Sequence, residues 1–242
     1  MSSDTKSIND YKGSASKRGL FGRRQGRTLS PTRARSMDEL LPKLEIKPDQ
    51  LTEDHSLCPK TLFNDEKKEY WLELGFGHGE HVTGLMEQAP QNGFLAIEPF
   101  INGMSAFLLS IEKASQDNIR VLMDDGMILM RSLKENSLDR IYILNPDPWH
   151  KKRHHKRRII NHKNLDIFAK ALKPGGTLIL TSDVEDLAEW MCTHTTTHPE
   201  FQWQASSKKD WHTPPENWIP TRYETKGAKG AKKMVYMTFT RL

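Results

Sequence analysis

One acidic side chain, Asp147, lies between two prolines in the sequence N-P-D-P-W at residues 145–149, just before a strongly basic stretch. Each proline disfavours the helical conformation of the residue before it, so Asn145 and Asp147 are both expected to be extended, with the carboxylate held in one direction. Residues 151–158 contain six lysines and arginines and no acid, a composition suited to phosphate binding. A fixed carboxylate beside a polyanion-binding strip predicts chemistry on a nucleic acid. The alternative is a solvated loop that ends a strand.

A glycine-rich loop follows the apolar run at residues 70–74 and has glycines at alternate positions, Gly75, Gly77 and Gly79. Such a loop allows a tight turn and brings a ligand close to the backbone. Glu98 ends the next apolar run, where it can accept hydrogen bonds from both ribose hydroxyls of an adenosine-containing cofactor. Glu73 would repel a pyrophosphate but attract a cationic sulfonium or amino group, which favours S-adenosylmethionine. A nicotinamide-dependent oxidoreductase remains the alternative.

Asp124 and Asp125 follow the third apolar run, at residues 119–123, and Asp125, which precedes Gly126, is the favoured site residue. Its carboxylate could accept a hydrogen bond from the adenine amino group of the cofactor. The structural alternative is an N-cap of the short amphipathic stretch that begins at Gly126.

The positive charge is concentrated in three segments of the chain. The formal net charge is +5, yet residues 1–36 carry net +7, residues 150–158 net +6 and residues 222–242 net +5, so the remainder is net −13. This distribution is typical of a nucleic-acid enzyme, because clustered bases neutralise phosphates while the acidic remainder limits indiscriminate binding.

The composition argues against several classes of protein. Hydrophobic residues make up 36%, and no stretch approaches the roughly 18 apolar residues of a membrane span or resembles a secretory signal. We therefore expect a cytoplasmic protein that is not bound to membranes. Cys58 and Cys192 are far apart and indicate neither a disulfide nor a zinc site. His150 and His154 have ligand-like spacing without a third ligand nearby, so no metal is expected.

The chain divides into a basic N-terminal segment, residues 1–36, which is predicted to be disordered, and one domain, residues 37–242. Leu40, Leu41 and Leu44 indicate a short helix at the start of this domain. Apolar runs at 70–74, 94–98, 119–123, 138–144 and 177–181 each precede an amphipathic stretch. These units predict a Rossmann-like α/β fold, a mostly parallel sheet with helices on both faces and an antiparallel edge strand at residues 235–240. Ligands should bind beyond the carboxyl ends of the parallel strands.

Seven segments in order make the chain similar to the bacterial tRNA (guanine-N7-)-methyltransferases. They are F-G-R-R-Q-G-R at 21–27, L-P-K-L at 41–44, L-E-L-G-F-G-H-G-E at 72–80, I-E-P-F at 97–100, P-D-P-W-H-K-K-R-H-H-K-R-R at 146–158, T-S-D at 181–183 and T-R-Y-E at 221–224. The resemblance implies a class I methyltransferase fold, S-adenosyl-L-methionine as donor, and the variable-loop guanine of tRNA, nucleotide 46, as acceptor.

The resemblance also implies roles for individual residues. Asp147 matches the proposed catalytic residue. The positions of the cofactor-binding carboxylates are Glu73, Glu98, Asp125 and Asp147. The substrate-binding positions are Lys151, Asp183, Thr221, Arg222, Tyr223 and Glu224. Small departures occur at Pro99 and Phe100, where members vary, and at Asn145, where an aromatic residue is common.

The chemistry of guanine defines the roles expected of two carboxylates. N7 already carries an in-plane lone pair, so Asp147 is expected to position the guanine or the donor rather than to remove a proton. Glu224 can accept hydrogen bonds from guanine N1–H and the 2-amino group together. Its structural alternative is a surface ion pair with Arg222 or Lys226.

Other assignments remain open at the level of sequence. Asp183 could bind substrate or belong to a helix start, because Ser182 and Glu185 match a capping box. Trp149 could stack on a base, although core packing is favoured. A non-catalytic RNA-binding protein with the same fold is the main alternative function, and both a monomer and a homodimer are compatible with the sequence.

Overall fold

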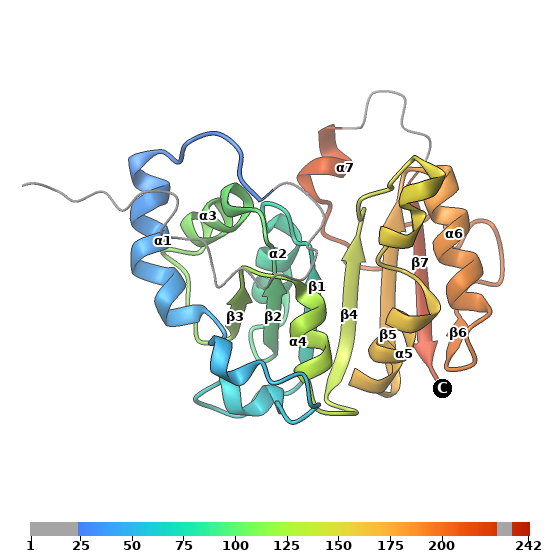
Figure 1. Cartoon of the computed structure of the whole chain (residues 1–242), viewed down its shortest axis with the longest axis horizontal. Helices are drawn as coiled ribbons and strands as arrows, with labels where there is room; N and C mark the ends of the chain where they lie inside the picture. The colour runs from blue at the N-terminus through green and yellow to red at the C-terminus, as the bar shows by residue number, and fades with distance from the viewer. Residues whose placement is uncertain (1–23, 227–233) are drawn as a thin grey trace, which may run out of the picture.

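The computed structural model describes residues 24–226 and 234–242, which contain a sheet with the strand order β3-β2-β1-β4-β5-β7-β6 (Figure 1). Five strands are parallel: β1 (Tyr70–Leu74), β2 (Gly93–Ile97), β3 (Ile119–Leu122), β4 (Leu138–Leu144) and β5 (Leu172–Ser182). The C-terminal strand β7 (Val235–Arg241) runs antiparallel to β5. The Rossmann-like fold with an antiparallel C-terminal strand is confirmed. A short strand that was not predicted, β6 (Phe201–Trp203), pairs with the outer side of β7.

Helices cover both faces of the sheet, as the alternation of apolar and amphipathic stretches predicted. On one face lie α1 (Pro31–Leu44), α2 (Glu80–Gln88) and α3 (Ile101–Ser110), and on the other lie α4 (Gly126–Ser132), α5 (His162–Ala171) and α6 (Glu185–Thr196). Shorter helical turns are η2 (Pro48–Gln50), η3 (Pro59–Leu62), η4 (Lys152–Arg157) and α7 (Arg222–Lys226). None of the helices in this described part of the chain is long and apolar enough to cross a membrane.

The alternation of side chains along β1 shows how the sheet separates two cores. Leu72 and Leu74 are buried in the core shared with α4, α5 and α6, whereas Trp71 packs against the core shared with α1, α2 and α3. Successive side chains of a strand point to opposite faces, so Glu73 faces α2 together with Trp71. Glu73 therefore lies on the opposite face of the sheet from Leu72 and Leu74.

The first helix starts earlier than the sequence indicated. Ser30 is its N-cap and accepts a hydrogen bond from the Arg33 amide at 3.5 Å, and Pro31 occupies the first turn. Before it, Gly26 N–H donates to Oδ1 of Asn102 in α3 at 2.7 Å. The predicted domain boundary at residue 37 therefore falls inside α1, and residues 24–36 pack on the domain. The remainder of the predicted tail, residues 1–23, lies outside the described residues.

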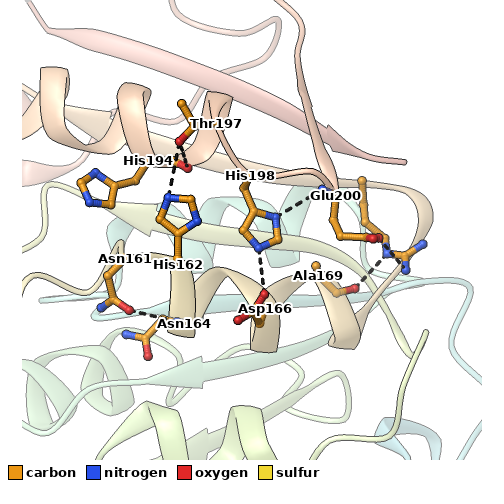
Figure 2. Close-up of polar contacts among 10 residues, drawn as sticks. Asn161, His162, Asn164, Asp166, Ala169, His194, Thr197, His198 and Glu200 are labelled. Atoms are coloured by element: carbon orange, nitrogen blue, oxygen red, sulfur yellow. Dashed lines mark hydrogen bonds and ion pairs between the residues drawn. The ribbon is translucent and has the colours of Figure 1, made fainter.

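A histidine cluster joins α5 to the end of α6 (Figure 2). Nε2 of His198, which is 3% exposed, lies 3.0 Å from Oδ1 of Asp166. His162 at the start of α5 contacts the Thr197 hydroxyl at 3.4 Å, and its ring centroid lies 5.6 Å from that of His194. These contacts hold the two helices together, and the cluster contains none of the predicted site residues.

Candidate active site

A cavity of about 430 Å³ opens at the carboxyl ends of β1, β2 and β4. Its lining brings together four residues predicted for the cofactor, Gly75, Glu98, Asp125 and Asp147. They come from four different strand-to-helix connections, so only the parallel register of the sheet places them in one site. Of the remaining predicted cofactor residues, Glu73, Gly77 and Gly79 do not line this cavity.

The three loop glycines all adopt backbone angles that other residues rarely adopt. The φ angles are 76° at Gly75, 63° at Gly77 and 86° at Gly79. A Cβ at Gly79 would lie 2.4 Å from Cδ2 of Phe107, so this glycine also allows α2 to pack against α3. Nothing lies within 4 Å of a Cβ built at Gly75 or Gly77. The loop is thus held by conformation and packing, and it leaves space beside its first two glycines.

Glu98 fixes the loop to the end of β2. Its Oε2 accepts a hydrogen bond from Gly77 N–H at 2.7 Å, and its Oε1 accepts one from Phe100 N–H at 2.9 Å. The side chain is 7% exposed, and this burial raises the pKa of Glu98 to about 7, although the two amide hydrogen bonds act in the opposite direction. The nearby carboxylates of Asp147 and Glu73 raise the pKa further. Glu98 therefore changes its charge near neutral pH.

Glu73 is 3% exposed and faces α2. Nδ1 of His81 donates to Oε2 of Glu73 at 2.8 Å. This contact was not predicted from the sequence, because it depends on the direction of the β1 side chains. Glu73 does not line the cavity, although its charge contributes to the raised pKa of Glu98.

The structural alternative for Asp125 is confirmed, and the residue also faces the site. It is the N-cap of α4, with Oδ1 accepting a hydrogen bond from Met127 N–H at 3.0 Å, and it also lines the cavity. Because capping uses one carboxylate oxygen, the other can still contact a ligand. The cap fixes the direction of the side chain.

Asn145 is not extended, contrary to the expectation from the proline that follows it. Its φ angle is 46°, and its N–H donates to the carbonyl oxygen of Thr181 at 3.0 Å, which extends the pairing of β4 with β5 by one residue. The side-chain Nδ2 and Oδ1 of Asn145 are buried without a hydrogen-bond partner in the structure, at the wall of the cavity. Asn tolerates this left-handed conformation better than most residues do.

Asp147 is exposed and lines the cavity. Its carboxylate forms no hydrogen bond or ion pair with residues 24–226 or 234–242. The nearby Trp149 also lines the cavity, with the Arg157 guanidinium 5.0 Å from the centroid of its ring, and it belongs to neither hydrophobic core. The prediction that Trp149 packs in the core is therefore wrong, because the left-handed turn at Trp149 (φ 48°) keeps the ring at the cavity wall.

The basic strip is not uniformly available for phosphates. Four of its bases are exposed: Lys151, Lys152, Arg153 and Lys156. Arg158 is only 1% exposed, because it forms an ion pair with Asp186 of α6 and donates from Nε to the carbonyl oxygen of Pro148 at 3.0 Å. The prediction that Arg158 contacts phosphate is wrong, since its guanidinium holds the loop onto α6.

The substrate residues predicted near the C-terminus gather at α7, which lies beyond the carboxyl ends of the strands (Figure 1). The Tyr223 hydroxyl donates to both carboxylate oxygens of Asp183, at 3.2 and 3.1 Å. The capping alternative for Asp183 is wrong, because the N-cap of α6 is Val184 and no side chain caps that helix. Thr221 accepts a hydrogen bond from Glu224 N–H at 3.2 Å, and Arg222 is exposed.

Comparisons with known proteins fit this geometry. A family model described as "Putative methyltransferase" matches residues 67–237. A tRNA (guanine-N(7)-)-methyltransferase of Bartonella henselae is 42% identical over 222 residues, covering 91% of this chain and 94% of that protein. This chain belongs to that methyltransferase family. A protein with the same description from Brucella melitensis is 38% identical, covering 92% of this chain and 94% of that protein. A solved structure of an antibiotic-related methyltransferase shares the fold, with a TM-score of 0.50 and 14% identity, covering 81% of this chain and 95% of that one.

The cavity fits S-adenosylmethionine, the donor used by methyltransferases of this family. Glu98 at the end of β2 has the carboxylate that ribose hydroxyls require, and Gly75 leaves open space next to the backbone. The side-chain amide of Asn145 and the carboxylate of Asp147 lie at the same cavity, and neither has a hydrogen-bond partner among the described residues. Unpartnered polar groups at a cavity wall are the groups that a polar ligand satisfies.

Proposed function

We propose that this protein transfers a methyl group from S-adenosylmethionine to N7 of the variable-loop guanine of tRNA, with Asp147 as the catalytic residue. Methylation of tRNA guanine N7 with this donor is the activity of the family to which the chain belongs. The observation that carries the proposal for the site is the gathering of Gly75, Glu98, Asp125 and Asp147 around one cavity next to an exposed basic turn.

On the donor side, the protein binds and orients S-adenosylmethionine. Glu98 accepts hydrogen bonds from the ribose, and the Asp125 carboxylate oxygen that does not cap α4 accepts one from the adenine amino group. Glu73 attracts the cationic end of the donor through its charge. When bound, S-adenosylmethionine supplies an electrophilic methyl group on its sulfonium.

On the acceptor side, N7 of guanine attacks without prior loss of a proton, so the site needs alignment more than a base. Asp147 is exposed at the cavity and unpaired within the described chain, which suits a group that positions the guanine or the donor amino group. Lys151 and the exposed bases of η4 contact the tRNA backbone, and Asp183, Tyr223 and Glu224 hold the base. Arg222 contacts a tRNA phosphate, and Thr221 caps the turn that contains Glu224.

The test is methylation of an unmodified tRNA transcript with labelled S-adenosylmethionine, followed by mapping of the modified nucleotide. We expect a single 7-methylguanine in the variable loop. The matched control is the same transcript with adenine at that nucleotide, which should not be labelled. Methylation at another atom or another loop would contradict the proposal. Binding of labelled S-adenosylmethionine compared with NAD separates it from the oxidoreductase and from a non-catalytic RNA-binding protein.

A further inference from the structure

The segment before α7 is fastened to α2, the helix that follows the glycine loop. Gln88 Nε2 donates to the carbonyl oxygen of Asn217 at 3.1 Å. Ile219 lies over Gly84, where an added Cβ would come within 2.7 Å of its Cδ1. The Trp218 ring packs on the His81 ring with centroids 4.8 Å apart. Residues far apart in the sequence thus link the cofactor loop to the predicted substrate segment.

Trp218 also fixes the direction of Glu224. Its indole Nε1–H donates to Oε2 of Glu224 at 3.0 Å, while Oε1 is buried and has no hydrogen-bond partner in the structure. An unpaired buried acceptor costs about 1–3 kcal/mol. No residue of the described chain donates to Oε1, and a donor on a bound molecule can reach this buried atom after a movement of the short helix α7. Guanine presents N1–H and an amino group, both suitable donors.

His81 connects this arrangement to the donor side. Its ring is 1% exposed and lies between the Trp218 ring and the Tyr142 ring, with centroids 4.8 Å from each. Its Nδ1 is bonded to Glu73. A continuous series of contacts therefore runs from Glu73 through His81 and Trp218 to Glu224.

We propose that Trp218 and His81 are positioning residues: Trp218 orients Glu224 toward the target guanine, and His81 orients Glu73 toward the methyl donor. Their packed rings set the distance between the two carboxylates. The inference rests on the proposed function and extends it to two residues outside the family's motifs. Neither residue touches substrate itself, so each acts through its carboxylate.

The acceptor half is tested with a double-mutant cycle of Trp218→Phe and Glu224→Gln, measured by steady-state methylation of tRNA. Phenylalanine keeps a ring against His81 and removes the N–H. We expect each single change to raise KM for tRNA roughly tenfold, the worth of one hydrogen bond to a charged group, with kcat little altered. The double variant should be no worse than the more impaired single variant, because the indole N–H acts only through the Glu224 carboxylate that it orients. The matched control is Trp203→Phe, whose buried Nε1–H has no partner in the structure and should leave KM unchanged.

The donor half is tested by the affinity for S-adenosylmethionine. His81→Phe should weaken it several-fold, and His81→Asn, which retains an N–H near the position of Nδ1, should restore most of it. Additive effects in the cycle, or equal losses in both histidine variants, would overturn the positioning roles. A wild-type protein that does not methylate tRNA would instead refute the proposed function. Unchanged circular dichroism and cofactor binding of Trp218→Phe establish that it folds.

Discussion

The pKa of Glu98, about 7, predicts an unusual pH dependence for the ligand-free protein. The unfolded chain should titrate near the ordinary value of 4.5, so between these two values the folded state holds one more proton than the unfolded state. Stability contributed by the protonated side chain is therefore fully present at low pH and is lost as pH rises through 7. Replacement by glutamine removes this proton linkage while it retains one acceptor oxygen for the loop amides.

The size of the effect follows from the linkage slope of about 1.4 kcal/mol per pH unit for one proton. Between pH 5 and pH 8, the free energy of unfolding of the wild type should fall by roughly 2.5 kcal/mol more than that of Glu98→Gln. Only 7% of Glu98 is exposed, so solvent screening reduces this value little. The same carboxylate must be ionised to accept hydrogen bonds from both ribose hydroxyls, so donor affinity should fall up to about tenfold per pH unit below 7.

The measurement is urea unfolding of both proteins at a series of pH values, together with calorimetric titration of S-adenosylmethionine. Buffers of different ionisation enthalpy should reveal proton release on donor binding near pH 7 in the wild type but not in Glu98→Gln. Parallel stability curves of the two proteins between pH 5 and pH 8 would refute the reasoning. They would mean that the loop amides compensate fully for burial.

Three further predictions concern other parts of the site. Asp147→Ala should abolish turnover with unchanged melting temperature, because the carboxylate is exposed; near-normal single-turnover rates would make it structural. Reversal of Lys151 and Lys152 to glutamate should weaken tRNA binding and reduce the slope of log affinity against log salt concentration by roughly 0.7–0.9 per lost contact. It should also slow methylation at saturating tRNA, and a change in affinity alone would place the basic strip away from the reaction. Gly79→Ala should lower the free energy of unfolding by about 1–3 kcal/mol, because φ at this position is 86° and the Phe107 side chain occupies the space of the added methyl group. An unchanged midpoint of urea unfolding would show that Phe107 and α3 move aside.

The strands and the location of the site could be predicted because they depend on local patterns. β1 and β4 begin and end where their apolar runs do, and the parallel order then places Glu98 and Asp147 at one edge of the sheet. Sequence reasoning failed where a distant residue decides the outcome. Asn145 turns left-handed because Thr181 binds its N–H, and this contact outweighs the preference set by the following proline.

The contacts of Trp218 and Arg158 were also beyond prediction from the sequence. Most of the domain lies between His81 and Trp218 in the sequence, and only the folding of the C-terminal segment over α2 brings the two rings together. Arg158 has the same side chain as its exposed basic neighbours, yet the acidic residue Asp186 of α6 and the Trp190 ring surround it. Composition gives the charge of a segment, whereas burial depends on which helix lies beside it.

The burial of Arg158 bears on how efficiently the basic turn can hold RNA. Ordering a flexible loop on binding costs about 1–2 kcal/mol per residue in backbone entropy. In this protein the turn is already fixed at its start by the pairing of Asn145 with Thr181 and at its end by Arg158 on α6. The four exposed bases between these anchors therefore lose mainly side-chain freedom when they contact phosphates, and most of their electrostatic attraction can appear as affinity. One arginine that never touches RNA would thus strengthen the contacts of its neighbours by making them rigid beforehand.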